Sequence, residues 1–138
     1  MKLPPYLKKG DKVAITCPAK KLSELPIDAI NLLESWGLEV VLGKTVYGAH
    51  HQFSGTDTER AADLQQFLGE MDYISFHVPK QKDGSAVIGA NEFARMKRGV
   101  FMSNAARGGV VNEDALLNAL NEGIVAGMAL DVFENEPN

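Results

Sequence analysis

The sequence predicts an α/β fold: a doubly wound parallel sheet of five strands, with helices on both faces making three layers. Short apolar runs of strand length alternate with stretches of helical periodicity along all 138 residues. Right-handed crossovers between such strands produce a parallel sheet covered on both faces. The length suits one core, and 45% hydrophobic with 23% charged residues is typical of globular domains. We therefore expect a single domain over residues 1–138, with strand order 2-1-3-4-5.

The first half of the chain predicts two strands, one helix and a loop. The first strand is expected over 12–17 and ends at Pro18. A helix follows, with Ser23 as its cap, Pro26 in its first turn and Gly37 after its last turn. The second strand covers 38–42 and leads into a glycine-containing loop over 43–55. The apolar residues spaced to share one face of the helix are Ile27, Ile30, Leu33 and Trp36.

The second half predicts three helices and three strands. Thr56 and Glu59 form a capping-box pattern that opens the first of these helices. Strands are expected over 73–78, 100–104 and 125–133, and a short helix over 91–97. Asn112 caps the last helix, whose first turn is acidic, and Gly123 closes it.

Residues 1–69 resemble the N-terminal part of the LD-carboxypeptidase family, the muramoyl-tetrapeptide carboxypeptidases. The matching stretches are 4–15, 17–19, 32–40, 51–57 and 60–66. The family usually has serine where Cys17 stands. Its nucleophilic serine, glutamate and histidine lie beyond this segment, so the resemblance implies no complete hydrolase site.

Residues 70–138 resemble the nucleotide-binding domain of D-3-phosphoglycerate dehydrogenase and related D-2-hydroxyacid dehydrogenases. The matching stretches are 72–79, 93–97, 104–111, 126–127, 129–133 and 136–137. The resemblance implies that Arg107 is the substrate-binding catalytic arginine. It also places Glu136 on the glutamate that orients the catalytic histidine, and Asp131 on an acidic residue near the nicotinamide.

The phosphate-binding part of such a domain is missing from the sequence. Dinucleotide-binding domains place Gly-x-Gly-x-x-Gly after the first strand, but residues 17–22 contain no glycine. Leu42-Gly43-Lys44 stands where an acidic ribose-binding residue is expected, and the catalytic histidine is expected past residue 138. Losing a general acid–base group alone removes about 100- to 10,000-fold in rate. We therefore expect no enzyme activity and no cofactor.

These observations favour an engineered chimera of flavodoxin-like or Rossmann-like fold, joined near 69–71. Its function would be that of a fold scaffold without evolved catalytic activity. The alternative is weak NAD or anion binding at the carboxyl edge of the sheet, from the dehydrogenase half. Arg107 could hold a carboxylate or phosphate there, although a solvated arginine is the simpler interpretation.

Other candidate residues favour ordinary structural roles. Cys17 is expected to be a buried thiol rather than a nucleophile. His50 and His51 lie in a glycine-rich loop, which favours solvation over a metal site, and His77 favours local packing over catalysis. Four lysines expected at the carboxyl edge make weak anion binding conceivable: Lys20, Lys21, Lys80 and Lys82.

Charge and composition limit the classes of partner that we expect. A net charge of −4 argues against nucleic-acid binding. No apolar run approaches the length of a membrane span, and a single cysteine suits the cytoplasm. A homodimer is conceivable through the last strand, as an exposed sheet edge, or through the surface at the junction.

Overall fold

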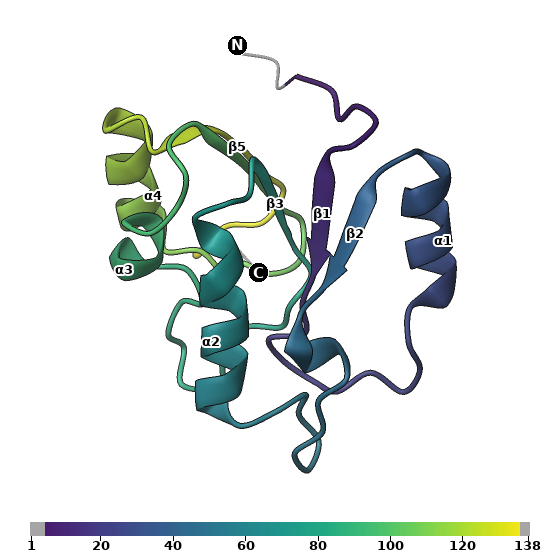
Figure 1. Cartoon of the computed structure of the whole chain (residues 1–138). Helices are drawn as coiled ribbons and strands as arrows, with labels where there is room; N and C mark the ends of the chain where they lie inside the picture. The colour runs from purple at the N-terminus through teal and green to yellow at the C-terminus, as the bar shows by residue number, and fades with distance from the viewer. Residues whose placement is uncertain (1–4, 136–138) are drawn as a thin grey trace. The chain divides into compact units, whose positions relative to one another are not determined.

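The computed structural model describes residues 5–135. The chain divides into two compact units, Pro5–Phe67 and the chain from Leu68 onward, which we call the N-terminal and C-terminal units. Figure 1 shows the elements of both. The boundary between the units lies close to residues 69–71, where the sequence predicts a junction. The single domain over 1–138 stays a prediction, and each unit is described by itself.

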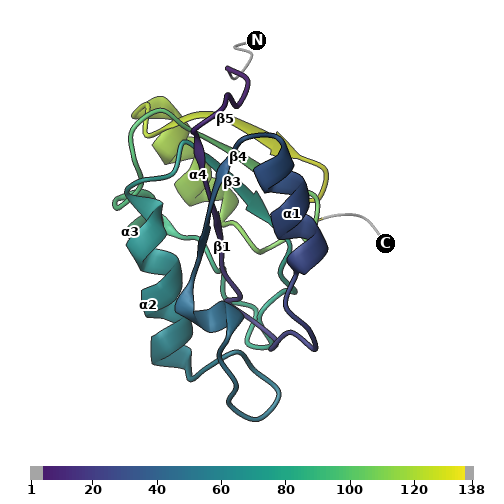
Figure 2. The same cartoon turned by 45° about the vertical axis from the view of Figure 1, so that its right-hand side comes forward.

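The N-terminal unit contains a two-stranded parallel sheet, β1 (Lys12–Ile15) and β2 (Glu39–Leu42). Helix α1 (Ile27–Ser35) lies beside this pair (Figure 2). A short 3-10 helix, η1 (Lys44–Val46), follows β2, and α2 (Asp57–Leu68) ends the unit. The predicted capping box is confirmed: Thr56 N donates to Glu59 Oε2 at 2.8 Å, and Glu59 N donates to Thr56 Oγ1 at 3.3 Å.

Helix α1 buries less of its apolar face than its spacing predicts. Ile27 and Trp36 are 51% and 57% exposed, and none of its residues is fully buried. Ile30 and Leu33 are half-buried in the middle of the helix. The helix is nine residues long and Pro26, rather than Ser23, is its N-cap residue. Ile27 and Trp36 therefore lie at the two ends of the helix, beyond the part that packs.

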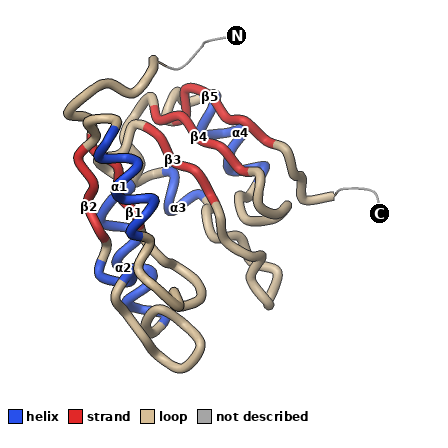
Figure 3. The backbone as a smooth tube through the Cα atoms, turned by 90° about the vertical axis from the view of Figure 1, so that its right-hand side faces the viewer, coloured by secondary structure: helices blue, strands red, loops and turns tan. Residues whose placement is uncertain are grey.

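The C-terminal unit is a three-stranded parallel sheet with two helices. Strands β3 (Tyr73–Phe76), β4 (Val100–Asn104) and β5 (Val125–Leu130) pair in the order β3-β4-β5. Helices α3 (Ala90–Phe93) and α4 (Glu113–Asn121) lie on one side of them (Figure 3). The core between sheet and helices contains Phe93, Val100, Met102, Leu116, Ala119 and Val125, all buried.

The α/β class with parallel strands is confirmed, but the single five-stranded sheet is not. The strands pair as β1-β2 and β3-β4-β5, and no pairing of β1 with β3 is present among residues 5–135. The predicted first strand, 12–17, ends at Ile15 because the following backbone bonds to side chains: Cys17 N donates to Thr45 Oγ1 at 2.9 Å. The order 2-1-3-4-5 therefore stays a prediction. No described helix is long and apolar enough to cross a bilayer.

Candidate functional site

The loops that follow β3, β4 and β5 lie at the carboxyl ends of three parallel strands. In open α/β sheets this edge is where ligands bind. Lys80 and Lys82 follow β3, Arg107 follows β4 and Asp131 follows β5, and all four side chains are exposed. The structure therefore places these predicted candidates on three neighbouring loops of one unit, as the strand order β3-β4-β5 requires.

Asn104, the last residue of β4, fixes two of these loops. Its side chain is 2% exposed, its Nδ2 donates to Arg107 O at 3.0 Å, and its Oδ1 accepts from Ala106 N at 3.1 Å. Its carbonyl oxygen accepts from Asp131 N at 3.1 Å. Sequence reasoning missed this residue. The available signal was a polar residue at the third inward position of the strand, after Val100 and Met102.

Two glycines after Arg107 allow close approach between loops. A Cβ on Gly108 would overlap the carbonyl oxygen of Phe133, so only glycine fits there. Gly109 has φ +78°, and a Cβ built on it would lie 3.0 Å from Lys80 Cε. The Arg107 backbone is thus held on both sides, while its guanidinium stays exposed and Nη1 donates to Ala106 O at 2.6 Å. The geometry presents a cation from a rigid loop.

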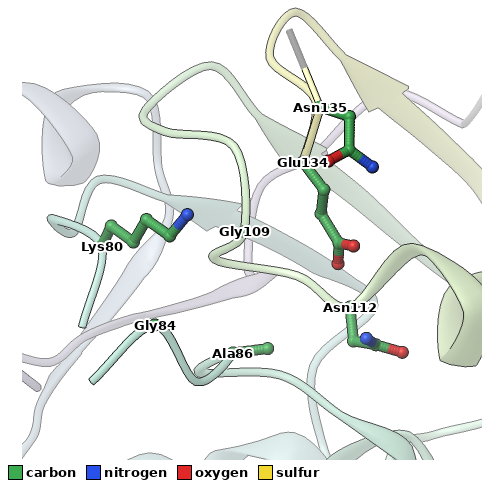
Figure 4. Close-up of a pocket in the computed structure, with 7 residues that line it drawn as sticks. All are labelled: Lys80, Gly84, Ala86, Gly109, Asn112, Glu134 and Asn135. Carbon is green, nitrogen blue, oxygen red and sulfur yellow. The ribbon is translucent and has the colours of Figure 1, made fainter. Parts of the chain in front are cut away.

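An open hollow of about 260 Å³ lies at this edge (Figure 4). In Figure 4 the Lys80 side chain extends toward Gly109, and the Glu134 carboxylate points toward Asn112. Glu134 Oε1 accepts from Glu113 N at 3.0 Å, and Glu134 N donates to Glu113 Oε1 at 2.6 Å. This reciprocal pair, which sequence reasoning also missed, ties the loop after β5 to the first turn of α4. The hollow is lined by Lys80, Gly84, Ala86, Gly109, Asn112, Glu134 and Asn135.

His77, at the end of β3, makes a local contact. Its Nε2 lies 2.9 Å from Ser75 Oγ, which in turn accepts from Ser103 Oγ at 3.0 Å. Ser75 and Ser103 are paired in register on β3 and β4. The imidazole thus contacts a short hydroxyl network on the sheet, and it is exposed rather than packed in the core.

The remaining candidates belong to the N-terminal unit: Cys17, Lys20, Lys21, His50 and His51. The two histidine rings contact each other edge-on at 4.5 Å. Among residues 5–135 no group of three metal-ligating side chains is present. Glu136 lies outside the described residues.

Cys17 is a half-buried free thiol. Burial raises the pKa of this thiol, and the negative charge of Asp63 raises it further. A raised pKa leaves less thiolate near neutral pH, so the environment is the reverse of the one that activates a nucleophilic cysteine.

Comparison with known proteins identifies one family across most of the chain. The sequence model described as "D-isomer specific 2-hydroxyacid dehydrogenase, NAD binding domain" matches residues 27–138. D-3-phosphoglycerate dehydrogenase of Archaeoglobus fulgidus is 46% identical over 78 residues, 56% of this chain and 15% of that protein. A glyoxylate reductase of Thermofilum pendens is 34% identical over 121 residues, 86% of this chain and 32% of that protein. The chain therefore spans less than a third of the length of either relative.

Solved structures similar to this chain come from the same family. An NADPH-dependent glyoxylate/hydroxypyruvate reductase of Sinorhizobium meliloti, in complex with NADP and sulfate, has a TM-score of 0.66 and 28% identity. The match covers 99% of this chain and 43% of that chain. A D-isomer specific 2-hydroxyacid dehydrogenase of Xanthobacter autotrophicus, in complex with NADPH, has a TM-score of 0.65 and 27% identity over 99% of this chain and 41% of that chain.

These matches correct the interpretation of the chain as an engineered chimera with a carboxypeptidase half. The family model begins at residue 27 and the Thermofilum alignment covers 86% of the chain, so both cross the expected junction at 69–71. The stretches at 32–40, 51–57 and 60–66, taken as carboxypeptidase-like, lie inside the dehydrogenase match. They contain a helix, a strand and a capped helix, which one α/β architecture shares with another, and so they are weak evidence of separate origin. This chain belongs to the D-isomer specific 2-hydroxyacid dehydrogenase family, matching its NAD-binding domain.

Proposed function

We propose that the carboxyl edge of the C-terminal sheet binds the nicotinamide-bearing part of NAD or NADP, with Arg107 as the residue that meets an anionic group. The observation that carries the proposal is an exposed guanidinium on a loop fixed by Asn104 and by the close approach of Gly108 to Phe133. Family membership supports it, and so do the relatives solved in complex with NADP or NADPH.

The residues at this edge fit such a ligand in charge. Arg107 and Lys80 supply two cations, neither of which has an ion pair among the described residues. Asp131 is exposed, and its backbone is fixed by the bond from its N–H to Asn104 O. Arginine recognises carboxylate and phosphate through its planar fork, while lysine acts as a point charge. When bound, a nicotinamide cofactor would supply hydride chemistry; the residues described here would bind and orient it.

A titration of the isotope-labelled chain with NAD tests the proposal. Saturable shifts are expected at the amides of 105–109 and 131–134. Arg107→Gln should weaken binding about tenfold, which corresponds to about 1.4 kcal/mol. Arg95→Gln, an exposed arginine between α3 and the start of β4, is the matched control and should bind as the parent does. Equal weakening by both variants, or no shift at 105–109, would refute the assignment.

We further propose that this chain alone does not catalyse oxidoreduction. His77 is engaged with Ser75, and the other two histidines belong to the loop of the N-terminal unit. A chain that oxidised NADH in the presence of glyoxylate or hydroxypyruvate would contradict this. The free thiol of Cys17 suits the cytoplasm. A homodimer, through β5 or through the surface near residues 69–71, stays a prediction.

A further inference from the structure

The connection between β1 and α1, residues 16–26, is the place where a doubly wound fold receives a pyrophosphate. Backbone N–H groups of a glycine-rich turn and the start of a helix meet the phosphate oxygens there. A site of this kind needs free N–H donors and little negative charge. The structure shows instead that this connection is bonded to the segment 44–60 of the same unit.

Two N–H groups of the connection already have acceptors within the chain. Cys17 N donates to Thr45 Oγ1 at 2.9 Å, and Lys21 N donates to Gln52 O at 3.2 Å. Pro18, between them, has no N–H. At the start of α1, Ile27 N donates to Leu25 O at 2.8 Å, and Pro26 is the N-cap residue. These groups cannot serve an anion without breaking bonds within the chain.

The side chains nearby point their donors at carbonyl groups. Ser54 Oγ donates to Cys17 O and also lies 3.2 Å from Ala19 O, to which Ser54 N donates as well. Arg60 Nε donates to Pro18 O at 3.1 Å.

The guanidinium of Arg60 has little capacity left for a ligand. Its Nη1 donates to Gly55 O at 2.7 Å, its Nη2 donates to Asp57 Oδ1 at 2.6 Å, and its Cζ lies 4.6 Å from the Phe53 ring centre. The one arginine beside this connection therefore bonds to the chain itself through all three nitrogens.

A buried carboxylate lies behind the connection. Asp63 is 4% exposed, accepts from Lys44 N at 2.8 Å and Thr45 N at 3.2 Å, and accepts a further bond from Thr45 Oγ1. Thr45 Oγ1 is also the acceptor for Cys17 N. One hydroxyl group thus separates the connection from a negative charge, which disfavours a second anion there.

We infer that the connection after β1 is a closed structural joint that receives no phosphate, so that this chain recognises nicotinamide mononucleotide as well as it recognises the whole dinucleotide. The inference rests on the proposed function for its ligand, while the closed joint rests on the N-terminal unit alone. This mode of recognition differs from that of a domain that binds its dinucleotide mainly through the pyrophosphate.

Three ligands separate the possibilities in amide-shift titrations of the full chain: NAD, nicotinamide mononucleotide and ADP-ribose. The mononucleotide is expected to shift 105–109 with a midpoint within about threefold of that of NAD, less than 0.7 kcal/mol. ADP-ribose is expected to leave 17–22 unshifted. Saturable shifts at 17–22 with ADP-ribose, or NAD binding more than about tenfold tighter than the mononucleotide, would overturn the inference.

Failure of the proposed function can be distinguished from failure of the inference about the closed joint. If neither NAD nor the mononucleotide shifts the amide signals of 105–109, the proposed function and its ligand are refuted. Unshifted amide signals at 17–22 with ADP-ribose would still support the closed joint. Ser54→Ala removes the hydroxyl that bonds to Cys17 O and Ala19 O, and Ser23→Ala, at an exposed position of the same connection, is its control. Both should keep the mononucleotide midpoint; a change confined to Ser54→Ala would show that the joint takes part in binding.

Discussion

Asp63 shows how much one enclosed side chain organises in the N-terminal unit. Its carboxylate accepts bonds from two backbone N–H groups and the Thr45 hydroxyl, and Gln66 Nε2 donates to it at 2.8 Å. Buried donors without partners each cost about 1–3 kcal/mol. The loop after β2, which the sequence marks only by its glycines, is therefore held in place by a residue of α2.

Asp63→Ala is expected to lower the free energy of unfolding by about 2–4 kcal/mol, because several buried donors lose their acceptor together. Urea denaturation followed by tryptophan fluorescence measures this, since the only tryptophan, Trp36, lies in the same unit. Asp28→Ala, an exposed acidic residue in the first turn of α1, should cost less than about 1 kcal/mol. Equal costs for the two variants would show that the buried carboxylate is not the anchor.

The Cys17 thiol should react slowly with alkylating reagents. Burial, and then the charge of Asp63, raise its pKa in the folded chain, so less thiolate is present at a given pH than in the unfolded chain. The rate of iodoacetamide labelling is expected to rise at a higher pH for the folded chain in buffer than for the unfolded chain in urea. By linkage, this thiol stabilises the folded state below the pKa of an unfolded cysteine, and the contribution fades as pH rises through the higher folded value. Coincident rate profiles would contradict the shift.

At the scale of the elements, local hydrogen-bonding signals were the most reliable part of the sequence. The capping residues of α2 and α4 are confirmed, as is Gly37, with φ +80° just after α1. Such signals depend on neighbouring residues only. The exposed ends of α1 and the early end of β1 depend on contacts with segments distant in the sequence, such as the bond from Cys17 N to Thr45 Oγ1. Hydrophobic periodicity does not reveal such contacts.

Asn112→Ala tests the cap of α4. The Asn112 Oδ1 accepts from Ala115 N at 2.8 Å, and replacing such a cap costs about 1 kcal/mol. Circular dichroism during urea unfolding measures the loss. Asn118→Ala, at an exposed position inside the same helix, should be neutral or slightly stabilising because alanine favours helix. A neutral Asn112→Ala would mean that the helix start is secured by the Glu113–Glu134 pair alone.

At the scale of the whole molecule, the two units have separate sheets. We expect unfolding to be non-coincident: Trp36 fluorescence follows the N-terminal unit, while α4 and its sheet contribute their own helical signal. Asp63→Ala should move the fluorescence transition and leave the second one in place. A single transition shared by both probes, in the parent and in this variant, would show that the chain unfolds as one cooperative body.

The candidate site was predictable in part at this scale. Arg107, Asp131 and Lys80 follow successive parallel strands, so topology alone brings them to one edge. The partners of Asn104 and the Glu113–Glu134 pair were not predictable, because these bonds join loops whose separation in space the sequence does not reveal. The chimera interpretation failed for a different reason: residue matches within strand and helix segments that many α/β proteins share were taken as the signature of a separate family.

The bonds that hold the loop after β2 have a consequence for proteases. Cleavage requires the chain around the cut site to leave the surface and extend into the enzyme, so local opening decides where a folded protein is cut. Lys44 has an exposed side chain, yet its backbone is held by Asp63 within η1, and the segment up to Arg60 is bonded to the chain after β1. Trypsin should therefore leave Lys44 intact and cut first beside Lys80 and Lys82. The loop after β2 would then stay uncleaved longer than the loop after β3.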